Sequence, residues 1–380
     1  MKKDKIKVFV ATSGGVDSSV ALYLLKKQGY DVTAVFIKIG ESIEVPDSGT
    51  GLSLDSCWID ERRDAMRVAS QLDVPFLTYD FEKEYSKEVL NYFYKEYKAG
   101  RTPNPDVMCN RQIKFSLFWK KAKSMGADMM ATGHYASIAP SHHSRTTSCH
   151  SRTTSCHSRE GGNLGLFASK DKEKDQSYFI YNLKSKDLEH ILFPIGDLEK
   201  SDVRKIAKKA KLITAGKKDS QGLCFVGKVN VREFLKKKIK PKKGKVVTVD
   251  GEIVGEHEGV WFYTIGQRRG LGVYGGGVPY FVVDKNIEKN IIVVARESEE
   301  KKYYKDELLL EDISWVSDMP KLPLDCQARI RYRAKLEKCK IIKVKNNLKV
   351  KFVKPQRAIS PGQSVVFYKG SEVLGGGIIQ

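Results

Sequence analysis

The N-terminal stretch from Ile6 to Leu25 constrains the fold more strongly than any other part of the sequence. An apolar run that ends at Ala11 is followed by a glycine-containing turn, and apolar residues then recur at helical spacing. A second apolar run, Val32 to Ile39, comes after Gly29, a residue that favours the end of a helix. This order of strand, turn, helix and strand predicts the opening of a parallel α/β domain.

The turn reads Ser-Gly-Gly-Val-Asp-Ser-Ser from Ser13 to Ser19. Adjacent glycines let a backbone approach a ligand closely, and the unpaired N–H groups of a helix N-terminus favour phosphate. Ordinary strand-to-helix turns also contain glycine and serine, but the complete string is more specific, and it lacks the lysine of a Walker A loop. It resembles the pyrophosphate loop of N-type ATP pyrophosphatases, which cleave ATP to AMP and pyrophosphate. The resemblance implies that Asp17 helps to hold Mg²⁺ against the pyrophosphate.

The composition favours a polyanionic partner in a reducing compartment. Lys and Arg number 67 against 46 Asp and Glu, so the formal net charge is +21. This excess favours nucleic acid over an acidic membrane surface, although a generally lysine-rich proteome would also produce it. No apolar stretch approaches the ~20 residues of a membrane span or forms a signal-peptide core. Seven scattered cysteines suit the cytoplasm, where we expect any disulfide to be transient.

The remaining patterns predict three domains. An α/β domain is expected over residues 1–225, a small β-rich domain over 226–290, and a β-barrel over 291–380. The resemblance of the glycine loop implies that the first is a catalytic domain of the ATP-pyrophosphatase type, similar to the adenine nucleotide alpha hydrolases. The expected helices are Asp60–Leu72, 81–99, Ile113–Met125, Lys172–Leu192 and Ser201–Ala210. The expected strands include Pro75–Tyr79, Asp128–Thr132, Val246–Val249, Ile291–Ala295, Leu308–Val316, Arg329–Ala334 and Val365–Tyr368.

Residues 141–162 break the pattern with a polar heptad, His-Ser-Arg-Thr-Thr-Ser-Cys, that occurs twice and begins a third time. Its histidines and cysteines have donor atoms suited to zinc. An unchanged polar repeat without apolar residues cannot bury a core, however, so we favour a disordered insertion in a surface loop.

Two cysteines, an aspartate and an arginine-rich stretch carry further chemical information. Cys109 precedes a predicted helix and lies near Arg111, and Cys224 follows two lysines, so both thiols have neighbours that favour the thiolate. Either cysteine alone would more simply be a buried, inert residue. Alternation in 329–333 predicts three arginines on one strand face, which suits phosphate contacts or a solvated surface equally. An adenylating loop with two cysteines and a basic β-rich tail is consistent with sulfur transfer to RNA.

At this point the chain resembles the tRNA-specific 2-thiouridylase family over nearly its whole length, apart from the repeat insertion. The family thiolates the wobble uridine of certain tRNAs. The resemblance rests on Ser13–Ser19, Ala99–Asp106 with Cys109-Asn110, Ala131–Tyr135, Lys174–Phe179, Lys218–Ser220 with Gly222–Phe225, Thr264–Arg268 and Ser360–Gln363.

The resemblance implies roles for particular residues. The expected ATP contacts are Ala11, Thr12, Ser13, Gly14, Gly15, Val16, Asp17, Ser18, Ile37 and Gly133. The flipped-out uridine would contact Asn104, Pro105 and Asp106, with Asp106 as a candidate general acid/base. Cys109 would be the nucleophile and Cys224 the persulfide carrier, joined transiently as a disulfide. The expected tRNA contacts are Lys174, Asp175, Gln176, Arg331 and Tyr332.

The same resemblance implies ATP and Mg²⁺ as cofactors and no membrane partner. The expected partners are tRNAs with wobble-uridine anticodons, such as the Lys, Glu and Gln acceptors, and a persulfide donor such as a cysteine desulfurase or sulfur-relay protein. Two other interpretations stay open at this point. A small-molecule adenylating ligase would explain the glycine loop but not the two cysteines or the basic barrel. A non-catalytic tRNA-binding protein with a vestigial nucleotide site would be contradicted by ATP-dependent AMP release that tRNA stimulates.

Overall fold

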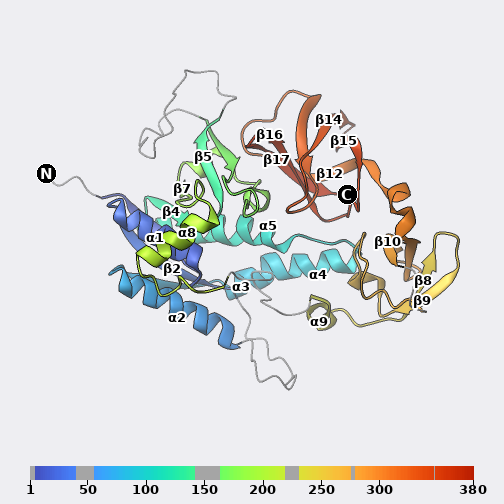
Figure 1. The fold of residues 1–380 in the computed structure, drawn as a ribbon, viewed down its shortest axis with the longest axis horizontal. Coiled ribbons are helices and arrows are strands. Elements are labelled where there is room, and N and C mark those ends of the chain that lie inside the picture. The colour runs from blue at the N-terminus through green and yellow to red at the C-terminus, as the bar shows by residue number, and fades with distance from the viewer. Residues whose placement is uncertain (1–4, 40–54, 142–162, 219–230, 275–278, 346) are drawn as a thin grey trace.

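The computed structural model describes residues 5–39, 55–141, 163–218, 231–274, 279–345 and 347–380. Its N-terminal domain is built on a five-stranded parallel sheet in the order β3-β2-β1-β4-β7 (Figure 1). The elements that form and flank this sheet are β1 (Lys7–Ala11), α1 (Val16–Lys27), β2 (Asp31–Lys38), α2 (Asp55–Gln71), β3 (Phe76–Asp80), β4 (Met129–Thr132), β7 (Ile191–Leu192) and α8 (Lys200–Lys209). The predicted α/β domain is therefore confirmed.

Both faces of this sheet are buried, which explains the continuous apolar strands in the sequence. Val8 and Val10 of β1 pack on one face against α1 and α2, whereas Phe9 joins a cluster on the other face. That second face is covered by two helical runs. The first run comprises α3 (Glu82–Tyr85), a π-helical segment η1 (Ser86–Leu90) and α4 (Asn91–Lys98); the second comprises α5 (Pro105–Cys109), a π-helical segment η2 (Asn110–Leu117) and α6 (Phe118–Ser124).

The second helical run begins earlier than the sequence pattern predicted. Its first residue is Pro105 instead of Ile113, because Asn104 caps the helix by accepting the N–H of Val107 at 3.3 Å. Proline suits the first helical position, where its missing N–H would have no partner within the helix. Cys109 consequently lies inside the helix and not in a loop ahead of it.

A second sheet follows α9 (Val231–Lys236), in the order β10-β11-β8-β9. Its strands are β8 (Gly244–Thr248), β9 (Ile253–His257), β10 (Tyr280–Asn286) and β11 (Ile291–Arg296). β11 pairs with both β10 and β8. The domain limit expected between residues 290 and 291 thus falls at the turn of the β10–β11 hairpin, and the central sheet extends to Arg296.

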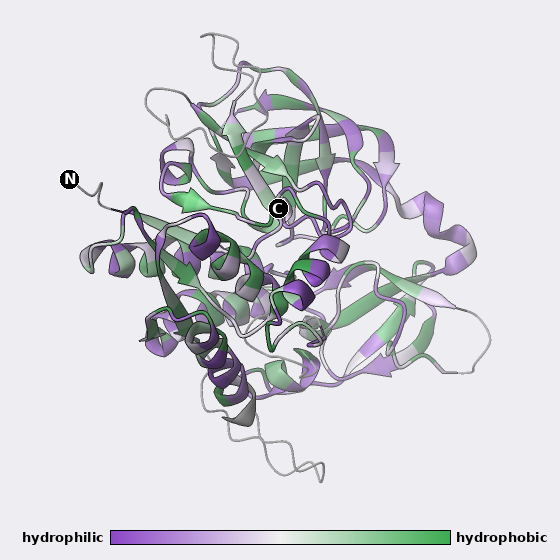
Figure 2. Ribbon diagram, turned by 60° about the vertical axis from the view of Figure 1, so that its left-hand side comes forward, coloured by the Kyte–Doolittle hydropathy of each residue, from purple (hydrophilic) through white to green (hydrophobic). Residues whose placement is uncertain are grey.

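The C-terminal strands form a closed antiparallel barrel, as predicted. The order β12-β15-β14-β13-β16-β17 is closed by pairing of β17 with β12. The strands are β12 (Lys305–Trp315), β13 (Leu324–Arg329), β14 (Glu337–Val344), β15 (Asn347–Gln356), β16 (Ser364–Lys369) and β17 (Glu372–Ile379). Buried residues from all six strands, including Leu310, Ile341 and Phe367, form its interior. Hydrophobic and hydrophilic residues alternate along many strands and helices, and the helices at the surface are largely hydrophilic (Figure 2).

A hairpin from the N-terminal half extends the barrel sheet. It consists of β5 (Ala136–Pro140) and β6 (Leu164–Ala168), and β6 pairs with β17. The repeat insertion lies between these two strands, and residues 142–162 are outside the described part of the chain. In the described part, no helix is both long enough and apolar enough to cross a membrane.

Two predicted elements were wrong. In place of a helix over Lys172–Leu192 there are a 3-10 turn, η3 (Ser177–Phe179), a short helix, α7 (Ser185–Leu188), and strand β7. Only the first residue of the predicted strand Arg329–Ala334 lies in a strand. β13 stops at Arg329 and the chain then turns, with Arg333 at φ 61°. A tertiary contact that local pattern cannot reveal joins the two places. The buried carboxylate of Asp175 accepts the backbone N–H groups of Ser169 and Ser177 and pairs with the side chain of Arg329 at 3.3 Å.

Candidate active site and the domain junction beside it

The glycine loop connects β1 to α1 at the carboxyl edge of the parallel sheet, where α/β folds bind ligands. Gly14 has φ +69°, and a side chain there would meet the carbonyl oxygen of Glu61 at 2.2 Å. The hydroxyls of Ser18 and Ser19 both donate to the carbonyl of Gly15, at 3.2 and 2.8 Å. α1 begins without a side-chain cap. Its first turn therefore presents backbone N–H groups suited to an anion.

Two neighbouring residues complete a cradle for a nucleotide. Gly133 follows β4, and a Cβ at this position would lie 2.7 Å from the backbone nitrogen of Ser18. The hydroxyl of Thr12, at the end of β1, is buried and has no hydrogen-bond partner among the described residues. A buried hydroxyl without a partner is rare in native proteins, so this group fits a ligand atom. Ala11 and Ile37 lie at the same sheet edge, partly buried.

Asp17 is engaged by two residues that the sequence did not single out for it. The ammonium of Lys200, at the start of α8, lies 2.7 and 2.8 Å from its two carboxylate oxygens. The hydroxyl of Tyr135 donates to the same carboxylate at 2.8 Å. Tyr135 stood in a recognised motif without a role, whereas nothing in the sequence pointed to Lys200, which is 183 residues from Asp17.

Asn104, Pro105, Asp106 and Cys109 lie together in the first turns of the α5 run. Asp106 is half-buried, and Cys109 is fully buried. The hydroxyl of Tyr178 lies near the side chain of Asn104 and donates to the carbonyl of Ser364 at 2.8 Å. Burial raises the pKa of Tyr178, which keeps the phenol protonated as a donor. The start of α5 is thereby attached to the barrel.

The segment before Asn104 is the junction of all three domains. The N–H of Thr102 donates to the carbonyl of Pro361 at 2.9 Å, and its hydroxyl lies 3.1 Å from that of Thr264. The amide of Gln363 donates to the carbonyls of Thr102 and Pro103, at 2.8 and 3.2 Å. Three motifs that are far apart in the sequence therefore meet at one place.

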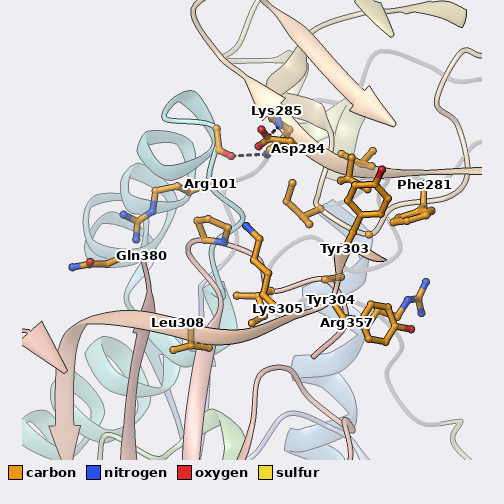
Figure 3. A pocket seen from close by; sticks show the side chains of 18 of the residues that line it. Arg101, Phe281, Asp284, Lys285, Tyr303, Tyr304, Lys305, Leu308, Arg357 and Gln380 are labelled. Atoms are coloured by element: carbon orange, nitrogen blue, oxygen red, sulfur yellow. Dashed lines mark hydrogen bonds between the residues drawn. The ribbon is translucent and has the colours of Figure 1, made fainter. Parts of the chain in front are cut away.

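A cavity of about 330 Å³ opens at this junction (Figure 3). Arg101 and Gln380 lie on one side of it and Phe281 and Tyr303 on the other, as the close-up shows. Lys285 lies at its upper edge, where its ammonium donates to the carbonyls of Gly100 and Tyr263, at 2.5 and 2.8 Å. Burial lowers the pKa of Lys285 to about 8. These contacts join the loop before α5 to the central domain.

The two segments with expected tRNA contacts lie side by side. The ring of Tyr332 is 4.5 Å from that of Phe179, and Arg333 donates to the carbonyl of Glu173 at 3.2 Å. Arg331 is exposed. Partial desolvation, followed by the nearby charge of Arg357, lowers its pKa. Within the first segment, Asp175 is only 2% exposed. Its buried carboxylate binds the backbone of its own loop by accepting the N–H groups of Ser169 and Ser177.

His134, which stands between Gly133 and Tyr135 in the sequence, is a buried side chain. Its Nδ1 is 2.7 Å from the hydroxyl of Thr132, and its ring packs against Phe115 and Phe193. Burial, followed by the charge of Lys114, holds the pKa of His134 well below its usual value. The ring therefore acts as a packing and hydrogen-bonding group at neutral pH.

Cys224 lies outside the described residues, so its distance from Cys109 is not defined. The chain that leads to it is fixed as far as Lys217, whose ammonium pairs with Asp64 at 2.6 Å. Arg204 also holds this segment by donating to the carbonyl of Lys217 at 2.5 Å. The charge of Lys217 acts on Glu61, the residue that packs against Gly14. The described chain that ends at Lys217 and Lys218 thus lies near the glycine loop.

Comparisons with known proteins agree with this architecture. Family models match residues 6–228 (tRNA methyl transferase HUP domain), 232–296 (tRNA methyl transferase PRC-barrel domain) and 305–379 (Aminomethyltransferase beta-barrel domain). The tRNA-specific 2-thiouridylases of Geobacillus kaustophilus and Geobacillus thermodenitrificans are each 44% identical over 375 residues, 98% of this chain and 94% of theirs. The enzyme of that name from Oceanobacillus iheyensis is 43% identical over 383 residues, 100% of this chain and 96% of its own.

The fold and the glycine loop define a three-domain α/β protein with an N-terminal HUP domain, a PRC-barrel domain and a C-terminal β-barrel. The chain belongs to the tRNA-specific 2-thiouridylase family.

Proposed function

We propose that this protein uses ATP and a persulfide to convert the wobble uridine of tRNA into 2-thiouridine. Its relatives carry the name of that activity over the full length of the chain, and a HUP domain implies the use of ATP. The net charge of +21 suits a tRNA substrate. The pyrophosphate-type loop favours adenylation, which turns a carbonyl oxygen into a leaving group.

One observation supports this proposal most strongly: a continuous series of contacts links the glycine loop to the segment of Asn104. Asp17 accepts the hydroxyl of Tyr135, whose backbone N–H donates to the side chain of Gln176 at 3.0 Å. The next residues of that loop reach the helical run that begins with α5, because the side-chain N–H of Asn110 donates to the carbonyl of Phe179 at 3.1 Å. A phosphate loop, a base-contacting helix start and an expected tRNA segment are thus coupled in one structure.

In the first step, the C2 oxygen of uridine attacks the α-phosphorus of ATP. The bond from this phosphorus to the bridging oxygen breaks, and pyrophosphate leaves. Asp106 accepts the N3 proton as this happens, since the attack makes that nitrogen acidic. Asn104 and Pro105 hold the base, and the first turn of α1 holds the phosphates.

In the second step, sulfur replaces the adenylated oxygen. The terminal sulfur of a Cys224 persulfide attacks C2 and AMP leaves, which gives a mixed disulfide between the base and Cys224. The Cys109 thiolate then attacks the Cys224 sulfur. This forms the Cys109–Cys224 disulfide and leaves the sulfur on the base, where Asp106 returns the proton. External thiols reduce the disulfide for the next cycle.

The position of Lys217 is consistent with this role for Cys224. Cys224 is the sixth residue after Lys218, and six residue steps span at most about 20 Å when extended. Because Lys217 is held beside Asp64 and Glu61, a persulfide at Cys224 can act within the N-terminal domain without a large displacement of the chain.

Magnesium, tRNA and sulfur-donor contacts follow the same proposal. Asp17 supplies one carboxylate, and the described residues contain no cluster of three metal-ligating side chains. Mg²⁺ would accordingly take its other ligands from phosphate and water, as it commonly does. Arg331, Tyr332 and the segment Lys174–Gln176 contact the tRNA. We further propose Lys, Glu and Gln tRNAs as substrates, a cysteine desulfurase or sulfur-relay protein as donor, and a cytoplasmic location.

Nucleotide products test this function directly. The protein is incubated with tRNA, ATP, Mg²⁺ and a persulfide source, and the nucleotides are separated by chromatography. AMP and pyrophosphate should form in equal amounts and depend on tRNA. ADP as the main product would exclude the pyrophosphatase chemistry, and a small-molecule ligase would form AMP without tRNA.

A further inference from the structure

The ion pair between Lys200 and Asp17 lies at the mouth of the glycine loop. Lys200 contacts both carboxylate oxygens, and its side chain is 14% exposed against 32% for Asp17. Its ammonium also lies 5.8 Å from the ring centre of Tyr135. Exposed surface ion pairs contribute little to stability. The side chain of Lys200 is instead mostly buried, and it lies where an anion is expected to bind.

The backbone of Lys200 is fixed by two features. Its N–H donates to the carboxylate of Asp171 at 2.9 Å. α8 packs directly against α1, with Val203 and Ala207 in one buried cluster with Val16. The base of the side chain cannot move away from the loop without breaking this packing, whereas its four-carbon stem can redirect the ammonium by a few ångströms.

Both carboxylate oxygens of Asp17 contact Lys200, so a cation that binds Asp17 would have to share or displace this ion pair. Asp17 is the second residue of α1, so its carboxylate lies beside the N–H groups that face the phosphates. A Mg²⁺ ion bound there competes with the ammonium for the same oxygens, and it brings the negative charge of the pyrophosphate with it.

We propose that Lys200 is a pyrophosphate-binding residue that exchanges partners during the reaction. It neutralises Asp17 before substrate binds and moves to oxygens of the β- and γ-phosphates when Mg²⁺ engages Asp17. This rests on the proposed ATP-dependent function. The ammonium then stabilises the charge that develops on the leaving pyrophosphate, and Tyr135 keeps the carboxylate in place during the exchange.

The first test measures ligand binding, independently of turnover. Calorimetry with Mg²⁺ compares pyrophosphate and AMP binding to the wild-type protein, Lys200→Gln and Lys200→Arg. Lys200→Gln should weaken pyrophosphate binding roughly tenfold or more, the loss expected for one charge-assisted hydrogen bond. AMP should bind unchanged, which also shows that the variant is folded. Lys200→Arg should recover part of the loss. Pyrophosphate binding to Lys200→Gln with wild-type affinity would overturn the proposal.

The second test removes the competing carboxylate. Without Mg²⁺, Asp17→Asn should bind pyrophosphate more tightly than the wild-type protein, because Lys200 no longer has a charged partner in Asp17. The double variant Asp17→Asn/Lys200→Gln should lose this gain. Equal Mg²⁺-free affinities for the single and double variants would assign the gain to another group and contradict the role of Lys200. A wild-type protein that binds neither AMP nor pyrophosphate would overturn the proposed function together with this inference.

Discussion

Gln363 of the barrel donates its side-chain N–H to the backbone carbonyl of Thr102 at 2.8 Å, two residues before Asn104. The same amide reaches the carbonyl of Pro103. The barrel therefore fixes the chain that leads into α5. This contact gives a physical reason for the presence of the motif at Ser360–Gln363 in a domain distant from the glycine loop.

The Gln363 contact predicts a long-range effect on thiolation. Gln363→Glu keeps the side-chain shape but removes the donor, so two acceptors lose their partner. We expect a loss of about 1–3 kcal/mol in the free energy of unfolding and a lower rate of 2-thiouridine formation. Gln356→Glu is the matched control, because the Gln356 amide donates to the carbonyl of Lys354, two residues away in its own strand. Equal effects of the two substitutions would contradict the junction model.

His134 predicts a loss of stability in acid. Its folded-state pKa lies well below the unfolded value of about 6.5. Below pH 6.5 the unfolded chain therefore binds a proton that the folded chain does not, and stability falls by at most about 1.4 kcal/mol per pH unit. Above pH 6.5 this contribution is constant.

Denaturant unfolding at pH 7.5 and pH 5 measures this effect. His134→Asn should lose less stability between the two values than the wild-type protein, whatever its stability at pH 7.5. His190→Asn, which changes a partly exposed histidine stacked on Trp119, should keep the wild-type dependence. An unchanged pH dependence in His134→Asn would show that another group titrates.

The repeat insertion should be removable. The N–H of Ser141 donates to the carbonyl of Asn163 at 2.9 Å, so the two ends of the insertion lie together at the β5–β6 hairpin. Replacing 142–162 with a short Gly/Ser linker should leave thermal stability and thiolation largely intact. A Gly/Ser segment of the original length is the control for loop length. Stoichiometric zinc that disappears together with activity on deletion would contradict this expectation.

Two arginines from the predicted stripe should behave differently. Arg329 pairs with the buried Asp175, whereas Arg333 contacts the backbone of Glu173 from an exposed position. Arg329→Gln leaves a buried carboxylate without its cation and should cost about 3 kcal/mol or more in unfolding free energy. Arg333→Gln should cost little stability and weaken tRNA binding mainly at low salt. Similar stability losses in both variants would contradict the structural role assigned to Arg329.

The sequence predicted what depends on local pattern. The strand, glycine turn and helix at Ser13–Ser19 follow from periodicity and turn chemistry, and so do the barrel strands β12 and β16. The other four barrel strands were not predicted at their observed positions. The helix over Lys172–Leu192 was wrong, and the loop found there depends on the buried carboxylate of Asp175, which accepts the N–H groups of Ser169 and Ser177. The contact between Lys200 and Asp17 could not be predicted, since it depends on the packing of α8 against α1 and leaves no local pattern.

The decisive measurement is mass spectrometry of nucleosides from tRNA treated with ATP, Mg²⁺ and a persulfide donor by cysteine variants of the full chain. Because the sulfurs of Cys326 and Cys339 lie 3.6 Å apart and could form an unrelated disulfide on oxidation, both are first replaced by serine, which should preserve activity.

In that background, Cys109→Ser and Cys224→Ser should each abolish 2-thiouridine. Cys109→Ser should still carry transferable sulfur at Cys224, and non-reducing peptide mapping of the parent after turnover should find the Cys109–Cys224 linkage. Formation of 2-thiouridine at the parental rate by Cys224→Ser, with the same donor, would contradict the mechanism.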